Sequence, residues 1–318
     1  MMKKILITYA LHKEPLVELF EQFDVFMPEN KGLSRDQVLE MIPDYEVLVP
    51  NFGFYTDQEM IDKGKKLELI ANYGVGFNNI DVDYAARKGI AVTNIPKTTC
   101  EPTAELAFAL LLAAGRRIGY YDRKLREPGG IDWSTYGDAG LPVTGKILGI
   151  IGMGRIGQSL ARRAVASGMS IIYHNRNRLN HAIEKLYDAR YVSFEELLQT
   201  SDYISLNAPS TPETLKMIGE RELMQMKKTA VFINTARGNM VDEAALVKAL
   251  KDNIIWAAGL DVYEHEPHIS PELLTFDNVL LAPHAGTKTI EDRNKMAEET
   301  AQNIIGFYGG AYAVSRVN

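Results

Sequence analysis

Three side chains of complementary chemistry stand in the last third of the sequence. Arg237, Glu266 and His284 each come a few residues after one of three successive apolar runs whose composition predicts strands. A guanidinium binds a carboxylate through two parallel hydrogen bonds, an imidazole exchanges a proton near neutral pH, and a carboxylate can orient that imidazole. Because the carboxyl ends of parallel strands open on one edge of a sheet, we expect the three side chains to converge. Taken singly, each would more often be a surface or capping group.

A glycine-rich turn precedes these residues in the chain. Gly152, Gly154 and Gly157 form the pattern G-x-G-x-x-G, directly after the apolar run 146–151 and before the helical run 158–167. In that setting the first glycine permits a tight turn, the second lets the backbone approach a pyrophosphate, and the third lets helix and strand pack closely. The motif predicts a dinucleotide site with contacts from its glycines and from Arg155 and Ile156.

The end of the next predicted strand indicates which dinucleotide is preferred. An NAD site usually places Asp or Glu there to accept from the ribose 2′-hydroxyl. Here residues 173–178 contain no carboxylate: Asn175 occupies the expected position, and Arg176 and Arg178 follow it. Two arginines suit a 2′-phosphate. The sequence therefore favours NADP(H), with NAD(H) as the alternative.

Alternating strand and helix patterns must position these residues, and they fall into two sets. Four predicted strands lie before residue 95 and six lie between residues 146 and 282, which is typical of α/β architecture with parallel sheets. We expect a Rossmann doubly wound parallel sheet over residues 100–286 as the dinucleotide-binding domain. A smaller flavodoxin-like α/β substrate-binding domain would combine residues 1–99 with residues 287–318, where 290–307 predicts one more helix.

Composition narrows the class of protein. The chain has 318 residues, 46% hydrophobic and 24% charged, with a formal net charge of −6. That charge gives no basic footprint for nucleic acid or an anionic membrane, and no apolar stretch is long enough to span a bilayer. A single cysteine, Cys100, allows no intramolecular disulfide and fits the cytoplasm. The histidines form no cluster at metal-ligand spacing, so no metal is expected.

The motifs together resemble those of the D-isomer-specific 2-hydroxyacid dehydrogenase family, nearest its glyoxylate/hydroxypyruvate reductase branch. Residues 72–76, 103–105 and 234–238 are similar to the family's signatures, beside the glycine turn and the three chemical residues. The resemblance implies that Arg237 clamps the substrate carboxylate and that His284 is the acid/base, oriented by Glu266. It also implies a homodimer, substrate contacts from the backbone of Val75 and Gly76, and cofactor contacts from Thr103, Pro209, Thr214, Thr235, Asp261 and Gly286, in addition to the contacts that position assigns to Asn175 and Arg176.

Several functions remain open at this point. The leading one is reduction of a small 2-oxo acid such as glyoxylate or hydroxypyruvate, because aromatic residues in the loop 51–55 would narrow the substrate pocket unless Phe52 and Phe54 are core residues. A second is an NAD-dependent glycerate, phosphoglycerate or formate dehydrogenase of the same family. A third, of another class, is a dinucleotide-sensing corepressor-like binding protein.

Overall fold

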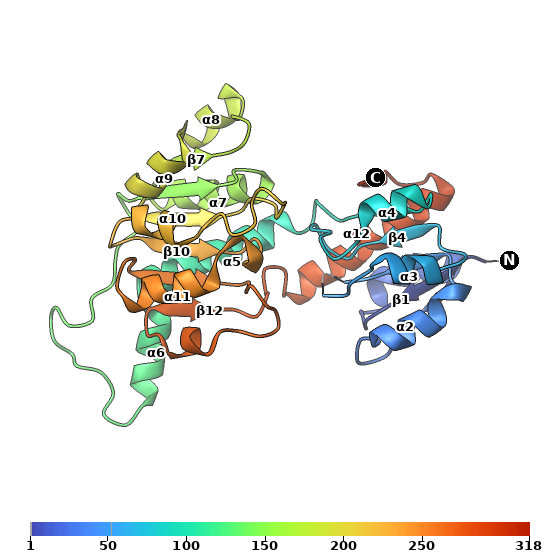
Figure 1. The fold of residues 1–318 in the computed structure, drawn as a ribbon, viewed down its shortest axis with the longest axis horizontal. Coiled ribbons are helices and arrows are strands. Elements are labelled where there is room, and N and C mark those ends of the chain that lie inside the picture. The colour runs from blue at the N-terminus through green and yellow to red at the C-terminus, as the bar shows by residue number, and fades with distance from the viewer. Residues whose placement is uncertain (1, 52) are drawn as a thin grey trace. The chain divides into compact units, whose positions relative to one another are not determined.

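The structure is a computed structural model that describes residues 2–51 and 53–318. The chain divides into two compact units, which we call unit 1 and unit 2 (Figure 1). Unit 1 comprises Met1–Thr99 and Thr287–Asn318, and unit 2 comprises Cys100–Gly286.

Unit 1 contains a five-stranded parallel sheet in the order β2-β1-β3-β4-β5. This is the flavodoxin-like order, so the predicted fold class of this part is confirmed. Strand β2 is absent from the prediction because it begins with the charged Asp24 and is largely exposed, unlike the buried strands of this sheet. The strands are β1 (Lys4–Ile7), β2 (Asp24–Phe26), β3 (Val47–Val49), β4 (Leu69–Ala71) and β5 (Ala91–Thr93).

Helices cover both faces of this sheet. Ile5 and Ile7 of β1 face one core cluster, and Leu6 between them faces the other, as the period of a strand requires. The first cluster includes Met296 and Ile304 from the long C-terminal helix, so that helix completes the core of unit 1. The helices are η1 (Glu14–Leu16), α1 (Val17–Gln22), α2 (Arg35–Met41), η2 (Ile42–Asp44), α3 (Gln58–Lys63), α4 (Val82–Arg87) and α12 (Ile290–Gly309), where η marks a 3₁₀ helix.

Unit 2 contains a seven-stranded parallel sheet in the order β12-β11-β10-β9-β6-β7-β8. The chain runs outward from β6 in both directions, which makes this a doubly wound Rossmann sheet and confirms the predicted fold. All six predicted strands are present, and the seventh, β8, is a short edge strand. The strands are β6 (Ile147–Ile151), β7 (Ser170–His174), β8 (Ala189–Tyr191), β9 (Tyr203–Leu206), β10 (Val231–Asn234), β11 (Ala257–Leu260) and β12 (Val279–Leu281).

The two faces of this sheet carry separate core clusters. Alanine and leucine side chains of α5 and α7 pack on one face, and the side chains of α9, α10 and α11 pack on the other. Within the described residues, none of the helices combines the length and apolar character needed to cross a bilayer. The helices are α5 (Cys100–Gly115), α6 (Ile118–Arg126), α7 (Arg155–Ala166), α8 (His181–Tyr187), α9 (Phe194–Thr200), α10 (Glu220–Gln225), η3 (Gly238–Met240), α11 (Glu243–Lys251) and η4 (Pro271–Thr275).

Candidate active site

The glycine turn joins β6 to α7 at the point where the strand order reverses. Gly152 has φ +90°, and a Cβ there would lie 2.5 Å from the backbone nitrogen of Ala208. A Cβ on Gly157 would lie 2.6 Å from the Gly152 carbonyl oxygen. Side chains are therefore excluded at both positions by neighbouring backbone. At Gly154, the N-cap of α7, a Cβ would meet only open space, so the backbone there is accessible to a pyrophosphate beside the start of a 12-residue helix.

Two buried polar atoms at the ends of neighbouring strands also fit a bound dinucleotide. Thr235 Oγ1, just after β10, and Asn207 Oδ1, just after β9, have no hydrogen-bond partner among the described residues. Buried polar atoms nearly always have a partner, so an orphaned pair at this edge of the sheet is where a ligand's polar groups would bind. Thr235 is predicted from the sequence; Asn207 is not, although it stands at the end of a predicted strand.

Four other predicted cofactor residues line the same sheet edge. Thr214 Oγ1 donates to the Pro209 carbonyl at 2.8 Å and accepts from the Thr211 N–H at 2.8 Å, which closes the loop after β9. Thr103, near the start of α5, and Gly286, after β12, are neighbours, since a Cβ on Gly286 would lie 3.2 Å from Thr103 Oγ1. Their contact with a cofactor stays a prediction.

The ribose end of the predicted site corrects one part of the sequence interpretation. Arg178, which the sequence offered as a second contact for a 2′-phosphate, is already paired with a carboxylate. Its Nε and Nη2 donate to Glu184 of α8 at 2.8 and 2.9 Å. Glu184 is 9% exposed and also accepts from the Tyr173 hydroxyl at 2.7 Å, so Arg178 is held by a nearly buried carboxylate. Arg176 is exposed, and Asn175 Oδ1 accepts from the Met153 N–H at 2.6 Å, inside the glycine turn.

The proposed acid/base pair is formed. His284 Nδ1 lies 2.8 Å from Glu266 Oε2, and Glu266 Oε1 accepts from the Tyr263 N–H at 3.1 Å. The two side chains are 25% and 33% exposed, respectively. Burial alone would raise the pKa of Glu266, but the hydrogen bond and charge of His284, the Tyr263 N–H and the charge of Arg237 together lower that pKa. Glu266 is therefore an anion that accepts from the imidazole.

The loop that carries His284 is held in an unusual conformation. His284 has φ +50°, in the left-handed region that side-chain-bearing residues seldom adopt. Asp261, at the end of β11, accepts from the N–H groups of Ala285 and Gly286 at 2.6 and 2.9 Å, one with each carboxylate oxygen. Burial raises the pKa of Asp261 although these two bonds lower it. The predicted cofactor residue Asp261 thus fixes the His284 loop.

Arg237 lies in the neighbouring loop, after β10. Its Nη1 donates to the Ala236 carbonyl at 2.6 Å. Burial lowers the pKa of Arg237, and the charge of Glu266 acts in the opposite direction, so the two groups are electrostatically coupled. A side chain at Gly238 would clash with the Tyr263 backbone, which packs the Arg237 loop against the loop that leads to Glu266. Within unit 2 the structure thus brings all three predicted chemical residues to the carboxyl ends of adjacent strands.

The predicted substrate contacts Val75 and Gly76 belong to unit 1, in the loop after β4. Asn94 Nδ2 donates to the Val75 carbonyl at 2.8 Å, and Asn72 Nδ2 donates to the Gly76 carbonyl at 2.9 Å. This loop is therefore fixed by its carbonyl groups. Of the two phenylalanines in the loop 51–55, Phe52 lies outside the described residues, and Phe54 packs on the core of unit 1. The partly buried position of Phe54 agrees with the alternative in which this residue packs on the core, and a part in the substrate pocket stays a prediction.

Comparisons with known proteins agree with this geometry. Residues 108–286 match the model of the D-isomer specific 2-hydroxyacid dehydrogenase NAD binding domain. The glyoxylate reductase of Thermococcus gammatolerans is 44% identical to the chain, covering 100% of this chain and 96% of that protein. The glyoxylate reductase of Pyrococcus furiosus is 43% identical at the same coverage.

Solved structures are similar over the same span. The crystal structure of a glyoxylate reductase from Paecilomyes thermophila has a TM-score of 0.88 and 36% identity, covering 99% of this chain and 98% of that chain. An NADPH-dependent glyoxylate/hydroxypyruvate reductase from Sinorhizobium meliloti, in complex with NADP and malonate, has a TM-score of 0.87 and 31% identity, covering 100% and 97%. The chain therefore belongs to the D-isomer-specific 2-hydroxyacid dehydrogenase family and is an NAD(P)-dependent oxidoreductase.

Proposed function

We propose that the chain is a glyoxylate/hydroxypyruvate reductase that converts a small 2-oxo acid into the D-2-hydroxy acid. The observation that carries the proposal is the 2.8 Å bond between His284 and Glu266, with Arg237 coupled to the same carboxylate. A cation, a proton carrier and its orienting anion at one sheet edge are what reduction of a keto acid requires. The names of the relatives in Thermococcus gammatolerans and Paecilomyes thermophila support the same substrate class.

Each of the three residues has a distinct role in this reaction. When bound, a reduced nicotinamide supplies the hydride. Arg237 binds the substrate carboxylate through its planar guanidinium and so fixes the 2-oxo group. His284 is bonded to Glu266 through Nδ1 and donates a proton from Nε2 to the substrate oxygen as negative charge develops there. Glu266 accepts a hydrogen bond from Nδ1 and so orients the ring with Nε2 toward the substrate oxygen.

We assign the cofactor to unit 2 and propose a preference for NADP(H). The support is the exposed Arg176 at the end of β7 and the lack of any carboxylate in residues 173–178. A ribose 2′-phosphate would gain a charge-assisted hydrogen bond from Arg176 and meet no like charge on that strand end. Unit 1, with Val75 and Gly76, is assigned to the substrate.

Steady-state assays of the purified protein with NADPH and NADH across a panel of 2-oxo acids test both proposals. The expected result is a larger kcat/KM for glyoxylate or hydroxypyruvate than for longer 2-oxo acids, and a larger value with NADPH than with NADH. Oxidation of phosphoglycerate or formate with NAD⁺ or NADP⁺, together with no reduction of glyoxylate or hydroxypyruvate, would refute the substrate assignment. A preference for NADH would refute the cofactor assignment and leave the substrate result standing.

We further propose a homodimer formed through unit 2. Figure 1 shows α6 and the segment after it standing off the body of that unit. Trp133 and Tyr136 in the segment are 87% and 90% exposed, and Ile118 and Leu125 of α6 are more than half exposed. Apolar groups gathered in this way mark an association surface. Light scattering should give the mass of a dimer, and Trp133→Ser with Tyr136→Ser should shift it toward a monomer; a monomeric parent protein would contradict the proposal.

We also propose a cytoplasmic location. The chain has a single cysteine and so can form no intramolecular disulfide, which fits a reducing compartment.

A further inference from the structure

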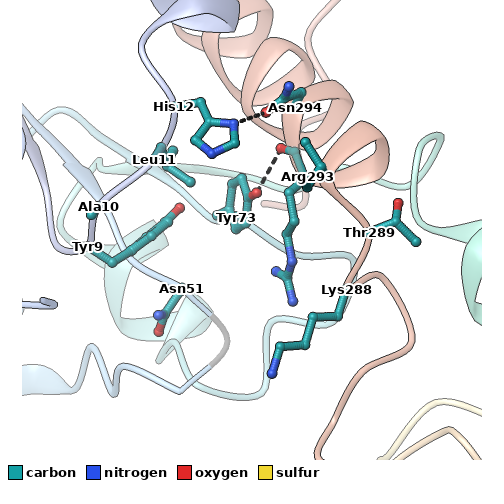
Figure 2. Close-up of a pocket in the computed structure, with 11 residues that line it drawn as sticks. Tyr9, Ala10, Leu11, His12, Asn51, Tyr73, Lys288, Thr289, Arg293 and Asn294 are labelled. Atoms are coloured by element: carbon teal, nitrogen blue, oxygen red, sulfur yellow. Dashed lines mark hydrogen bonds between the residues drawn. The ribbon is translucent and has the colours of Figure 1, made fainter. Parts of the chain in front are cut away.

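A cavity of about 440 Å³ lies within unit 1. Of the described residues that line it, only Asn51 belongs to a segment predicted for the substrate, the loop 51–55, and none is a predicted cofactor contact. Its floor comes from the residues that follow three parallel strands: Tyr9 after β1, Asn51 after β3 and Tyr73 after β4. The first turn of α12 and the residues before it close the other side (Figure 2). The carboxyl ends of parallel strands are where α/β sheets bind ligands, and this is such an edge in the second sheet of the chain.

The charged side chains in the lining are cationic. Lys288 and Arg293 both border the cavity, and no Asp or Glu is among the described residues that line it. Figure 2 shows the two side chains extending toward the same space. Arg293 is anchored, because its guanidinium lies 5.9 Å from the centre of the Tyr73 ring and its carbonyl accepts from the Tyr73 hydroxyl at 2.8 Å. The adjacent carboxylate of Asp292 accepts from the N-cap hydroxyl of Thr289 at 2.7 Å.

A buried hydroxyl in the same wall has no partner. The Tyr9 ring packs against the Tyr73 ring with centres 5.1 Å apart and planes tilted by 54°, yet the Tyr9 hydroxyl oxygen is buried and bonds to none of the described residues. Burial, more than the neighbouring Tyr73, raises the pKa of Tyr9 well above its usual range, so the hydroxyl keeps its proton. A protonated, buried and unpaired hydroxyl is a donor that lacks an acceptor. Two other polar groups of the lining bind each other: His12 Nδ1 lies 2.9 Å from Asn294 Oδ1.

We infer that this cavity binds a small organic anion through a carboxylate. Lys288 and Arg293 would neutralise the carboxylate, and the Tyr9 hydroxyl would donate a hydrogen bond to it. Leu11 and Ile290, which also line the cavity, suit the carbon skeleton of such a molecule. The carboxylate belongs either to the distal end of a larger substrate or to a separate effector, and both sources present the same chemistry to these residues.

Calorimetric titration of the whole protein with succinate, without nucleotide, tests the site independently of turnover. Succinamide is the control ligand, because it has the same carbon skeleton as succinate but no charge. The informative variants are Lys288→Gln, Tyr9→Phe and Arg293→Gln. Lys295→Gln is the matched control, because Lys295 is an exposed cation of the same helix outside the cavity lining. A further variant, Arg237→Gln, removes the carboxylate clamp proposed for the reaction, so binding at that clamp can be told apart from binding in the cavity.

The expected results separate the two sites. Succinate should bind and succinamide should not. Lys288→Gln and Arg293→Gln should each weaken succinate by about tenfold, and Tyr9→Phe by a smaller factor. Lys295→Gln and Arg237→Gln should leave this binding unchanged. Absence of succinate binding, or binding lost in Arg237→Gln and kept in Lys288→Gln, would overturn the inference without touching the proposed reaction. The melting temperature of Arg293→Gln shows whether unit 1 stays folded without the guanidinium that packs on Tyr73. If that variant unfolds, Lys288→Gln supplies the test, because Lys288 is exposed.

Kinetics with glyoxylate then identify the source of the anion. If the cavity takes the distal end of a substrate, succinate inhibits competitively and Lys288→Gln raises KM for 2-oxo dicarboxylates but not for glyoxylate. If it takes an effector, succinate changes kcat for glyoxylate and Lys288→Gln abolishes that change.

Discussion

Asp261 holds the backbone of His284 in place. In addition to the two carboxylate bonds to Ala285 and Gly286, the Asp261 carbonyl accepts from the His284 N–H at 2.8 Å. Three hydrogen bonds from one residue therefore fix three consecutive backbone N–H groups. This explains how the left-handed conformation of His284 is maintained, and it links the position of the proposed acid to the end of a central strand.

Asp261→Asn should therefore lower kcat clearly while it changes the melting temperature only slightly. The amide can accept only one of the two N–H groups, and its own NH₂ would face the other, at a cost of about 1–3 kcal/mol. Loss of a buried carboxylate, whose pKa is raised by burial, offsets part of that cost in the free energy of unfolding. The measurements are kcat and the melting temperature. Equal kcat for the variant and the parent would show that these bonds do not position His284.

His284→Ala should lower kcat by about 10² to 10⁴ because it removes the proton donor. Cofactor binding, followed by nucleotide fluorescence, should remain near that of the parent protein, since the glycine turn and α7 are untouched. Loss of both properties together would contradict the acid/base assignment. Cofactor binding by a parent protein that turns over none of the 2-oxo acids, with that binding unchanged in His284→Ala, would favour the corepressor-like alternative.

Arg237→Lys should raise KM for the 2-oxo acid by about tenfold or more, because an ammonium cannot reproduce the two parallel bonds of a guanidinium to a carboxylate. The charge itself is kept, so the variant separates geometry from electrostatics. KM for the nucleotide should stay nearly constant. A variant that binds the keto acid as well as the parent would place the carboxylate elsewhere.

Arg176→Ala should weaken NADPH by about tenfold and leave NADH within about twofold, since only NADPH carries the 2′-phosphate. Arg178→Ala is the matched control, because Arg178 is already bonded twice to Glu184. It should change stability and affect both nucleotides alike. Equal weakening of the two nucleotides by Arg176→Ala would argue against a phosphate contact.

The Glu184 carboxylate gives a pH-dependent prediction. Its hydrogen bond with Arg178 and a second with Tyr173 lower its pKa from 4.5 to about 2, against a smaller effect of desolvation. A group whose pKa is lower in the folded state stabilises the fold above its unfolded pKa and loses that contribution as the pH falls. Glu184→Gln should therefore lower the melting temperature near neutral pH, and the difference from the parent should shrink between pH 4.5 and 2. Glu196→Gln, which breaks an exposed pair with Arg190, should have a smaller effect. A difference that is constant with pH would contradict the assignment.

The sequence predicts most of what local pattern controls. The strand ends, the glycine turn and the positions of Arg237, Glu266 and His284 follow from apolar runs and spacing, because a parallel sheet gathers its carboxyl ends at one edge. Strands β2 and β8 escape prediction because a charged residue, Asp24 or Arg190, interrupts each of these partly exposed edge strands, whereas the edge strands β5 and β12 are apolar enough to be predicted. The pairing of Arg178 with Glu184 and the orphaned Asn207 also escape prediction, because each depends on which side chains meet in three dimensions.

The discontinuous construction of unit 1 has a consequence for how the chain is made. One face of its sheet is covered by Met296 and Ile304 of α12, which are synthesised after the whole of unit 2. Unit 2 is continuous in sequence and has all its strands once residue 281 has emerged. During synthesis the strands within residues 1–99 are therefore made before α12, and one apolar face of their sheet stays uncovered while unit 2 folds. The segment of the growing chain that is most prone to aggregate and to bind chaperones is therefore residues 1–99.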